Sequence, residues 1–338
     1  MGYPPGVAPE VAPELVAAAL GERYGFALAG LEPAARGWTG ETYTATTVDG
    51  ARFFVKVFPS SRLPRTAAPA LPALAELPRL GIREVPRVVP GQHGALGVWI
   101  GAHLVVVFDH LDARRVEPFP FGGEGIGDLV GRVHAATARV TAPPARETFE
   151  PPYAEELWQD VARLRAQATD EAPRAVLRSF VERRREELDR DWAAFGEVAR
   201  ACRAAGLELV LTHGDWPFNV LEDRGKRRYL VDWDEMLLAP AERDTWFAGD
   251  DPPFWRGYRP RRPDHAASHL ATAFYLYNRF FEELRGTARV ILADTPPDER
   301  AWAVKFVDSA WTMGLRTRMH SAWALARGVP PGARGGVT

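Results

Sequence analysis

The segment from Leu207 to Trp246 constrains the fold more than any other part of the chain. An apolar run ends at the cluster THGDWPFN, a polar turn follows, and a second apolar run ends at VDWD. This alternation predicts two short strands joined by a hairpin-like turn. We expect the hairpin to bring the side chains of Asp215, Asn219 and Asp232 near one point.

Carboxylate and amide oxygens at the ends of short strands suit phosphoryl transfer. One carboxylate orients a hydroxyl and accepts its proton, while an amide oxygen and a second carboxylate hold Mg²⁺, a cation that prefers oxygen ligands. An HGD tripeptide alone often makes no more than a turn. The combination of strand, HGD, Asn, hairpin and VDWD is far more specific and predicts a kinase-like site.

This segment resembles the catalytic and metal-binding loops of the aminoglycoside phosphotransferase and choline kinase family, which are small-molecule relatives of the protein kinases. The resemblance implies that Asp215 is the catalytic base and that Asn219 and Asp232 are metal ligands. It also implies structural roles in the loop for His213 and Asp244. Asn219 stands four residues after Asp215, one fewer than is commonest in the family, and we interpret this as a variant of the loop.

The resemblance covers about residues 20–325 and implies an α+β, bilobal, protein-kinase-like fold. Residues 1–111 would form a nucleotide-binding lobe with an antiparallel sheet and a helix. Residues 112–338 would form a larger, mainly α-helical lobe for catalysis and acceptor binding. The N-terminal pattern of strand, glycine turn, strand, Asp-Gly turn and strand independently predicts an antiparallel meander.

Lys56 interrupts the otherwise apolar strand RFFVKVF. It could simply face solvent, since a buried lysine is costly unless it is paired. By the resemblance, it is instead the lysine on the third strand that contacts the nucleotide phosphates. Gly37 and Gly40 would then belong to the turn that covers those phosphates, although any tight turn favours glycine.

A kinase lysine needs an acidic partner on the next helix. The helix-like stretch AAPALPALAELPRL at residues 67–80 contains three prolines, which are expected to break it, and its only acidic residue is Glu76. Relatives carry this glutamate a turn or two earlier. Glu76 therefore pairs with Lys56 through an irregular helix, or a carboxylate elsewhere does so and Glu76 is a solvated surface charge.

Carboxylates and aromatic residues near the HGD and VDWD motifs suit a cationic, ring-shaped polyol as the phosphoryl acceptor. The phrase VDWD with the following LAPAERD looks most like the spectinomycin phosphotransferase branch. A basic loop follows at residues 256–262 and keeps sugar-bearing nucleoside antibiotics open as acceptors. The residues predicted to contact the acceptor are Trp216, Asp234, Glu235, Trp255 and Tyr258.

Composition excludes several other functions. The net charge of −2 and the pI of about 6.5 do not favour nucleic acid as a partner. Cys202 is the only cysteine, so the chain cannot form an internal disulfide, which fits a reducing compartment. The N-terminus lacks the features of a signal peptide, and no apolar run has the length of a membrane span. We therefore expect a cytoplasmic protein without a membrane partner.

These observations predict a Mg²⁺-dependent phosphotransferase. It would move the γ-phosphoryl group of ATP or GTP to a hydroxyl of a small-molecule antibiotic, such as an aminocyclitol, an aminoglycoside or a sugar-bearing nucleoside, and so inactivate it. Two alternatives stay open. One is a metabolite kinase of the same fold that acts on choline, homoserine or a sugar. The other is a pseudokinase that serves as a binding module.

Overall fold

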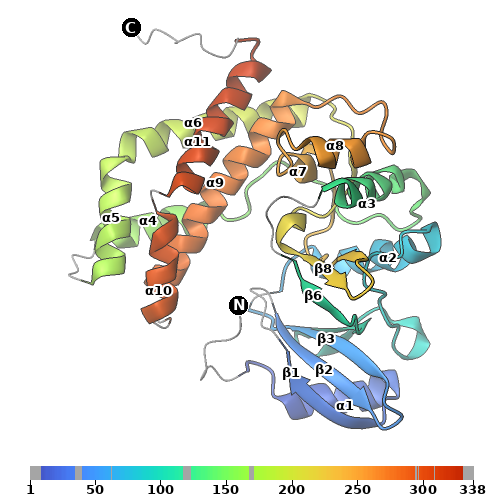
Figure 1. Ribbon diagram of the computed structural model, residues 1–338. Coiled ribbons are helices and arrows are strands. Elements are labelled where there is room, and N and C mark those ends of the chain that lie inside the picture. Colours follow the sequence, from blue (N-terminus) through green and yellow to red (C-terminus); the bar gives the residue numbers. More distant parts are fainter. Residues whose placement is uncertain are drawn as a thin grey trace, which may run out of the picture. The chain divides into compact units, whose positions relative to one another are not determined.

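The computed structural model contains two compact units (Figure 1). The first unit comprises Met1–Arg146 with Leu209–His265, and the second comprises Glu147–Glu208 with Ala266–Thr338. The predicted lobe boundary after residue 111 falls inside the first unit, and a division there stays a prediction. The structure describes residues 9–34, 40–61, 63–116, 123–166, 171–293, 295, 297–307 and 309–329.

A five-stranded antiparallel sheet forms the N-terminal part of the first unit. Its strand order is β1-β2-β3-β5-β4. The predicted meander is therefore confirmed, with a tight turn at Gly50, whose φ is +85°. The strands are β1 (Leu28–Pro33), β2 (Glu41–Thr47), β3 (Arg52–Phe58), β4 (Val98–Ile100) and β5 (His103–Asp109).

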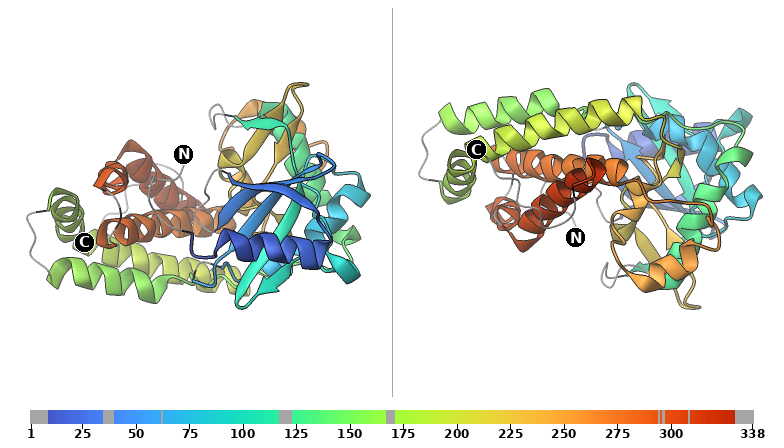
Figure 2. Two further views of the ribbon diagram at one scale, coloured as in Figure 1. Left: turned by 90° about the horizontal axis from the view of Figure 1, so that it is seen from below. Right: turned by 90° about the horizontal axis from the view of Figure 1, so that it is seen from above.

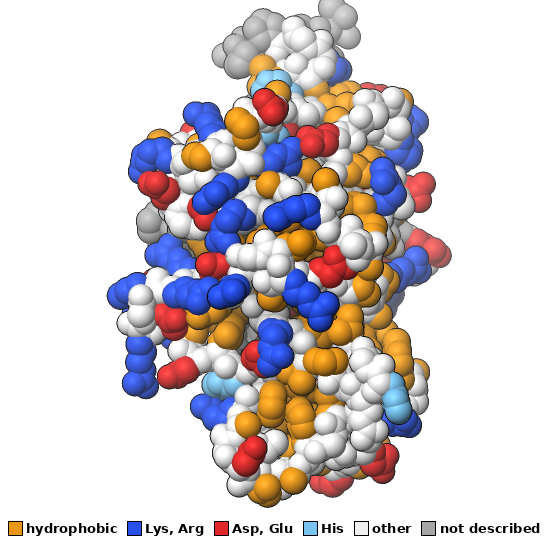
Figure 3. Space-filling view, turned by 90° about the vertical axis from the view of Figure 1, so that its right-hand side faces the viewer, with side chains coloured by type: hydrophobic (Ala, Val, Ile, Leu, Met, Phe, Trp, Pro, Cys, Tyr) orange, Lys and Arg blue, Asp and Glu red, His pale blue; other side chains and the backbone are white. Residues whose placement is uncertain are grey.

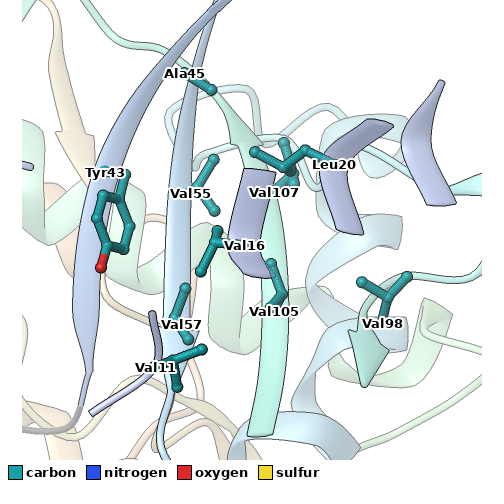
Figure 4. Packing of buried hydrophobic residues seen from close by; sticks show 10 residues of the cluster. All are labelled: Val11, Val16, Leu20, Tyr43, Ala45, Val55, Val57, Val98, Val105 and Val107. Atoms are coloured by element: carbon teal, nitrogen blue, oxygen red, sulfur yellow. The ribbon is translucent and has the colours of Figure 1, made fainter. Parts of the chain in front are cut away.

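One face of this sheet packs against helix α1 (Pro13–Tyr24), as Figure 4 shows. Val55 and Val57 of β3 point into this apolar core together with Val16 of α1. Because successive side chains of a strand alternate between the two faces, Lys56 points to the opposite face of the sheet. The strand pattern thus removes the lysine from the apolar core and directs it toward the rest of the unit.

Helix α2 (Ala67–Glu76) follows the sheet strand β3 and contains Pro72 within it. The expected break at its prolines is therefore a correction: the helix continues to residue 76 and passes into the 3-10 turn Leu77–Leu80. Pro72 removes one backbone hydrogen bond. Burial of the neighbouring Leu71 and Leu74 offsets that loss.

Short strands and helices complete the first unit. Strands β6 (Ala113–Arg115), β8 (Val220–Asp223) and β9 (Arg228–Leu230) form one antiparallel sheet, and β7 (Val210–Thr212) pairs with β10 (Leu237–Ala239). The hairpin β8–β9 is the one predicted from the sequence. The helices are α3 (Gly123–Ala135), α7 (Glu242–Thr245) and α8 (Pro252–Tyr258).

The second unit is helical, and its long helix α9 (His269–Leu292) lies against α4, α6 and α11 (Figure 2). The rings of Phe195, Tyr277 and Phe281 stack in its core, with centroids 5.9 Å apart in each pair with Phe195. With the sheet of the first unit, these helices confirm the predicted α+β class. The other helices are α4 (Ala154–Ala166), α5 (Ala172–Arg183), α6 (Arg185–Ala204), α10 (Pro297–Ala303) and α11 (Ala310–Ala326).

Within the described part of the chain, no helix combines the length and the apolar composition needed to cross a bilayer.

Candidate active site

The loop that follows β7 brings Asp215 and Asn219 together. After Asp215 the chain makes one 3-10 turn, Trp216–Phe218, and Asn219 closes it through its backbone N–H to the carbonyl of Trp216, at 3.1 Å. Asn219 Nδ2 then donates to the carbonyl of Asp215 at 2.9 Å and to its Oδ2 at 3.2 Å. The short spacing between the two residues is thus accommodated by a tight turn.

The side chain of Asp244, in α7, binds backbone N–H groups of this loop. Its Oδ2 accepts from the N–H of His213 at 2.9 Å, and its Oδ1 accepts from the N–H of Gly214 at 2.6 Å. Burial opposes ionisation of this carboxyl, but the interactions with His134, whose Nε2 lies 3.0 Å away, with His213 and with the N–H of Gly214 together outweigh burial and lower the pKa of Asp244. A buried carboxylate with several donors is a strong, directional anchor.

His213 is a structural residue with a defined tautomer. The backbone N–H of Asp215 donates to His213 Nδ1 at 3.1 Å, so the proton lies on Nε2, which donates to the carbonyl of Val231 at 2.8 Å. Burial lowers the pKa of His213, although the nearby Asp244 acts in the opposite direction. The imidazole is therefore neutral near pH 7 and connects the HGD loop to the segment after β9 that carries Asp232.

Gly214 leaves room for a buried arginine. Its φ is +94°, and a Cβ at this position would lie 2.4 Å from the guanidinium carbon of Arg243. Arg243 Nη1 in turn donates to Thr212 Oγ1 at 3.1 Å. The glycine of HGD is required both by the left-handed backbone and by this close approach.

Lys56 meets two carboxylates of the VDWD motif. Its Nζ lies 2.5 Å from Asp232 Oδ1 and also forms an ion pair with Asp234 Oδ2. Lys56 is only 5% exposed. Burial favours the neutral amine, but the charges of Asp234 and Asp232 outweigh burial and raise the pKa of Lys56. The chain has only three lysines among its 42 Lys and Arg residues, so a lysine at this buried position is unusual for this protein.

Asp232 has a strained backbone and a partly accessible side chain. Its φ is +68°, a conformation that non-glycine residues rarely adopt and that is concentrated at functional sites. Its side chain is 38% exposed. Desolvation acts against ionisation, and the charge and hydrogen bond of Lys56 outweigh it and lower the pKa of Asp232. The carboxylate is thus ionised and reachable by a ligand.

The predicted glycine turn is described in part. Gly37 lies outside the described residues. A Cβ at Gly40 would lie 3.3 Å from Cε of Lys56 and 2.8 Å from the carbonyl of Val57. Gly40 therefore lets the lysine stem pass beneath the backbone.

The structure does not bring Glu76 to Lys56. Glu76 Oε2 accepts from the N–H of Thr141 at 2.8 Å, and Oε1 accepts from Thr141 Oγ1 at 2.7 Å. The alternative expectation, a carboxylate elsewhere in the chain, describes what is observed: Lys56 pairs with Asp232 and Asp234. Glu76 sits at the last position of α2, where its side chain reaches the segment after α3 instead.

Two residues predicted to contact the acceptor are core residues. Trp216 and Tyr258 are both 0% exposed, which corrects their assignment. The ring of Trp216 stacks on Phe254 and its Nε1 donates to the carbonyl of Asp244 at 2.8 Å. The hydroxyl of Tyr258 lies 2.8 Å from His134 Nδ1. These two aromatic residues pack in the core that supports the HGD loop, and they do not face an acceptor.

The other predicted acceptor residues are more accessible. The carboxylate of Glu235 is half exposed and lies 3.5 Å from Arg243 Nη2. Trp255 is partly buried and its Nε1 donates to the carbonyl of Gly249 at 2.8 Å. The third residue, Asp234, faces Lys56.

Two arginines of the basic segment at residues 256–262, one in α8 and one after it, pair with helix α3. Arg256 pairs with Glu124 at 3.4 Å, and Arg261 pairs with Asp128 at 2.6 Å. Acidic side chains also lie among the basic ones on the face in Figure 3. These ion pairs account for two arginines that otherwise suggested an anionic acceptor.

The donor set fits Mg²⁺. Asp232 and Asn219 offer a carboxylate and an amide, and Mg²⁺ is commonly bound by one or two protein oxygens together with waters and substrate phosphates. Among the described residues no group of three or more His, Cys, Asp or Glu side chains could hold a metal by itself. The Asp232 and Asn219 side chains suit a cation whose remaining ligands are waters and nucleotide phosphates.

Sequence reasoning missed three residues of this site. Arg243 and His134 support the HGD loop from α7 and α3, and Thr66 Oγ1 donates to the carbonyl of Asp234 at 2.6 Å. No local pattern marks these residues, because their partners lie far away in the chain.

Comparisons with known proteins agree with this geometry. A sequence model of the phosphotransferase enzyme family matches residues 30–280. No curated protein sequence matches the chain. Among solved structures, a spectinomycin phosphotransferase in complex with ADP and spectinomycin has a TM-score of 0.69 at 16% identity, covering 93% of this chain and 99% of its own.

Two other structures show the same likeness. A microcompartment-associated aminopropanol kinase has a TM-score of 0.62 at 17% identity and covers 94% of this chain and 98% of its own. The amicoumacin kinase hAmiN, in complex with AMP-PNP, Ca²⁺ and Ami, has a TM-score of 0.55 at 16% identity and covers 95% of this chain and 96% of its own. At these identities the likeness shows the fold, and it confirms the predicted α+β, protein-kinase-like fold class.

Proposed function

The chain belongs to the phosphotransferase enzyme family, and from this premise we propose that it transfers the γ-phosphoryl group of ATP or GTP to a hydroxyl of a small-molecule antibiotic. One observation carries the proposal. Lys56 lies 2.5 Å from Asp232 although 176 residues separate them. The fold thus joins the two parts that phosphoryl transfer needs, a phosphate-binding cation and an ionised carboxylate.

Each residue has a role in this reaction. Asp215 accepts the proton of the acceptor hydroxyl as the hydroxyl oxygen bonds to the γ-phosphorus. The bond from that phosphorus to the β–γ bridging oxygen breaks, and the nucleoside diphosphate leaves. Asn219 orients Asp215, and Lys56 binds phosphate oxygens. Catalysis of this kind depends mainly on positioning and on charge neutralisation.

Asn219 and Asp232 would hold Mg²⁺, which would supply positive charge against the phosphates of the bound nucleotide. Support comes from the hard oxygen atoms of both side chains and from the ionised, accessible state of Asp232. The amicoumacin kinase was solved with a nucleotide analogue and a divalent cation, which agrees with such a requirement.

An antibiotic acceptor is favoured by two of the structural neighbours, which are a spectinomycin phosphotransferase and an amicoumacin kinase. Glu235 and Trp255 remain the proposed acceptor contacts, because both are accessible and suit a cationic, ring-shaped molecule. A second candidate, a kinase of a small amino alcohol, is favoured by the match to the aminopropanol kinase. We propose a cytoplasmic location, where nucleoside triphosphates are available and Cys202 stays reduced.

The test is phosphoryl transfer itself. The purified protein would be incubated with Mg²⁺, ATP or GTP, and a panel of spectinomycin, aminoglycosides, sugar-bearing nucleosides, choline and aminopropanol. Mass spectrometry would detect the gain of one phosphoryl group, with Asp215→Asn as the matched inactive variant. A product from an antibiotic that is absent with the variant is the expected result. A product from choline or aminopropanol alone would select the metabolite kinase, and no nucleotide turnover under any condition would select the pseudokinase.

A further inference from the structure

We propose that Asp234 is the positioning carboxylate of Lys56 and fills the role expected of a glutamate on the helix after β3. The inference rests on the proposed function, because it assigns a task within the same nucleotide site. The sequence predicts Asp234 as an acceptor contact, whereas the structure pairs it with Lys56.

Lys56 has two acidic neighbours, and they differ in accessibility. Asp232 Oδ1 and Asp234 Oδ2 both pair with Lys56 Nζ. The Asp232 side chain is 38% exposed, whereas that of Asp234 is 11% exposed. A positioning partner must remain with the lysine while phosphates and a cation are bound. The less accessible carboxylate is suited to remain, and the more accessible one is suited to turn toward the incoming ligand.

The backbone supports the same division. Asp232 lies at φ +68°, a strained backbone conformation that is concentrated at functional sites. The carbonyl of Asp234 instead accepts a hydrogen bond from Thr66 Oγ1 at 2.6 Å, and Thr66 immediately precedes α2. The start of α2 is therefore tied directly to Asp234. In this chain the helix is coupled to the lysine through that bond and not through a glutamate side chain.

The rival partner is occupied elsewhere. Both carboxylate oxygens of Glu76 accept hydrogen bonds from residues 141 and 142. These bonds lower the pKa of Glu76, with the N–H of Thr141 as the largest cause. Bringing Glu76 to Lys56 would break three hydrogen bonds, whereas Asp234 is in place already.

A double-mutant cycle on nucleotide kinetics tests the inference. Hydrolysis of ATP or GTP with Mg²⁺ would be measured for the full chain with Asp234→Asn, Lys56→Ala and the double variant. Asp234→Asn is expected to lower kcat/KM for the nucleotide about tenfold, the effect of one charged hydrogen bond, with most of the loss in KM. Lys56→Ala is expected to lose more, and adding Asp234→Asn to it should change kcat/KM by no more than about twofold.

Two further variants separate positioning from folding. Asp234→Glu keeps the carboxylate and should restore most of the nucleotide affinity lost in Asp234→Asn. Asp128→Asn removes a carboxylate that also accepts from two cations, Arg132 and Arg261, in the same unit. Its kinetics should match the wild type. A Tm for each protein identifies any variant that merely folds poorly.

Two results would overturn the proposal while leaving the proposed function intact. One is a full, additive loss when Asp234→Asn is combined with Lys56→Ala, which would mean that Asp234 acts independently of the lysine. The other is non-additivity of Lys56→Ala with Glu76→Gln instead. Failure of the proposed function is seen in the wild type alone, as absence of both nucleotide turnover and nucleotide binding, and it would remove this inference as well.

Discussion

Asn219 directs its amide nitrogen at Asp215, with Nδ2 2.9 Å from the Asp215 carbonyl and 3.2 Å from its Oδ2. The amide oxygen therefore points away from Asp215. One side chain can thus orient the proposed base with its nitrogen and offer an oxygen ligand to a cation. The single turn of 3-10 helix between the two residues lets the Asn219 side chain fold back onto Asp215.

Replacing Asn219 should disable the base without unfolding the protein. We expect Asn219→Ala to lower kcat about a hundredfold. General-base catalysis accelerates a reaction by a factor of about 10²–10⁴, and this factor depends on the orientation of the base. Asn219→Asp keeps an oxygen ligand but loses the N–H donor, so its kcat should also be lower than that of the wild type. The measurement is phosphorylated product per time by mass spectrometry. Full activity of Asn219→Asp would show that only the oxygen matters.

Gly214 should tolerate no side chain. Its φ of +94° already disfavours alanine, and the Cβ would lie 2.4 Å from the Arg243 guanidinium. The matched control is Gly81→Ala, because Gly81 has φ +88° with no atom within 4 Å of a Cβ. Left-handed backbone alone costs about 1–2 kcal/mol, so the control should lose a few degrees of Tm. Gly214→Ala should lose about 10 °C or more and its activity. Equal Tm losses would show that Arg243 moves aside freely.

Folding stability should fall as the pH drops below about 6.5, in part because of His213. Its folded pKa is lowered by burial, so below the unfolded value of about 6.5 the unfolded chain binds a proton that the folded chain does not. The histidine then opposes folding by up to about 1.4 kcal/mol per pH unit. The lowered pKa of Asp244 costs stability only at still lower pH, below about 4.

The measurement for His213 is urea denaturation of the wild type and of His213→Gln between about pH 8 and pH 5. Glutamine keeps an N–H donor toward the Val231 carbonyl but does not titrate. The wild type should be the more stable protein at pH 8, and the difference should narrow as the pH falls. A difference that stays constant with pH would show that His213 does not titrate on unfolding.

Helices α3 and α8 pack so closely that glycine is required at their contact. A Cβ at Gly127 of α3 would lie 2.0 Å from the carbonyl oxygen of Phe254, which is backbone and cannot rotate away. Gly127→Ala should therefore destabilise the protein by more than about 3 kcal/mol, since overpacking typically costs about 1–3 kcal/mol even where side chains can adjust. Gly125, in the same helix, has open space at this position. Gly125→Ala should raise stability by about 0.5–1 kcal/mol through helix propensity. Thermal unfolding compares the two variants directly.

Local sequence patterns predicted the elements of the site well. The pattern RFFVKVF predicted a strand that carries Lys56, and the hairpin pattern joined the HGD and VDWD motifs. Both predictions depend on the period of a strand and on turn residues, which are properties of neighbouring residues. The proline-rich stretch was the exception, because burial of apolar side chains kept α2 helical through Pro72.

The identity of Asp215, Asn219, Asp232 and Lys56 as candidates was thus determined by the sequence itself. Only the tertiary structure decided which carboxylate pairs with Lys56. Asp234 and Glu76 are both acidic residues in the sequence, and only packing determines which of them lies near the lysine. The same holds for Trp216 and Tyr258. An aromatic ring beside a motif can face a ligand or the core, and the choice depends on which surface the rest of the chain covers.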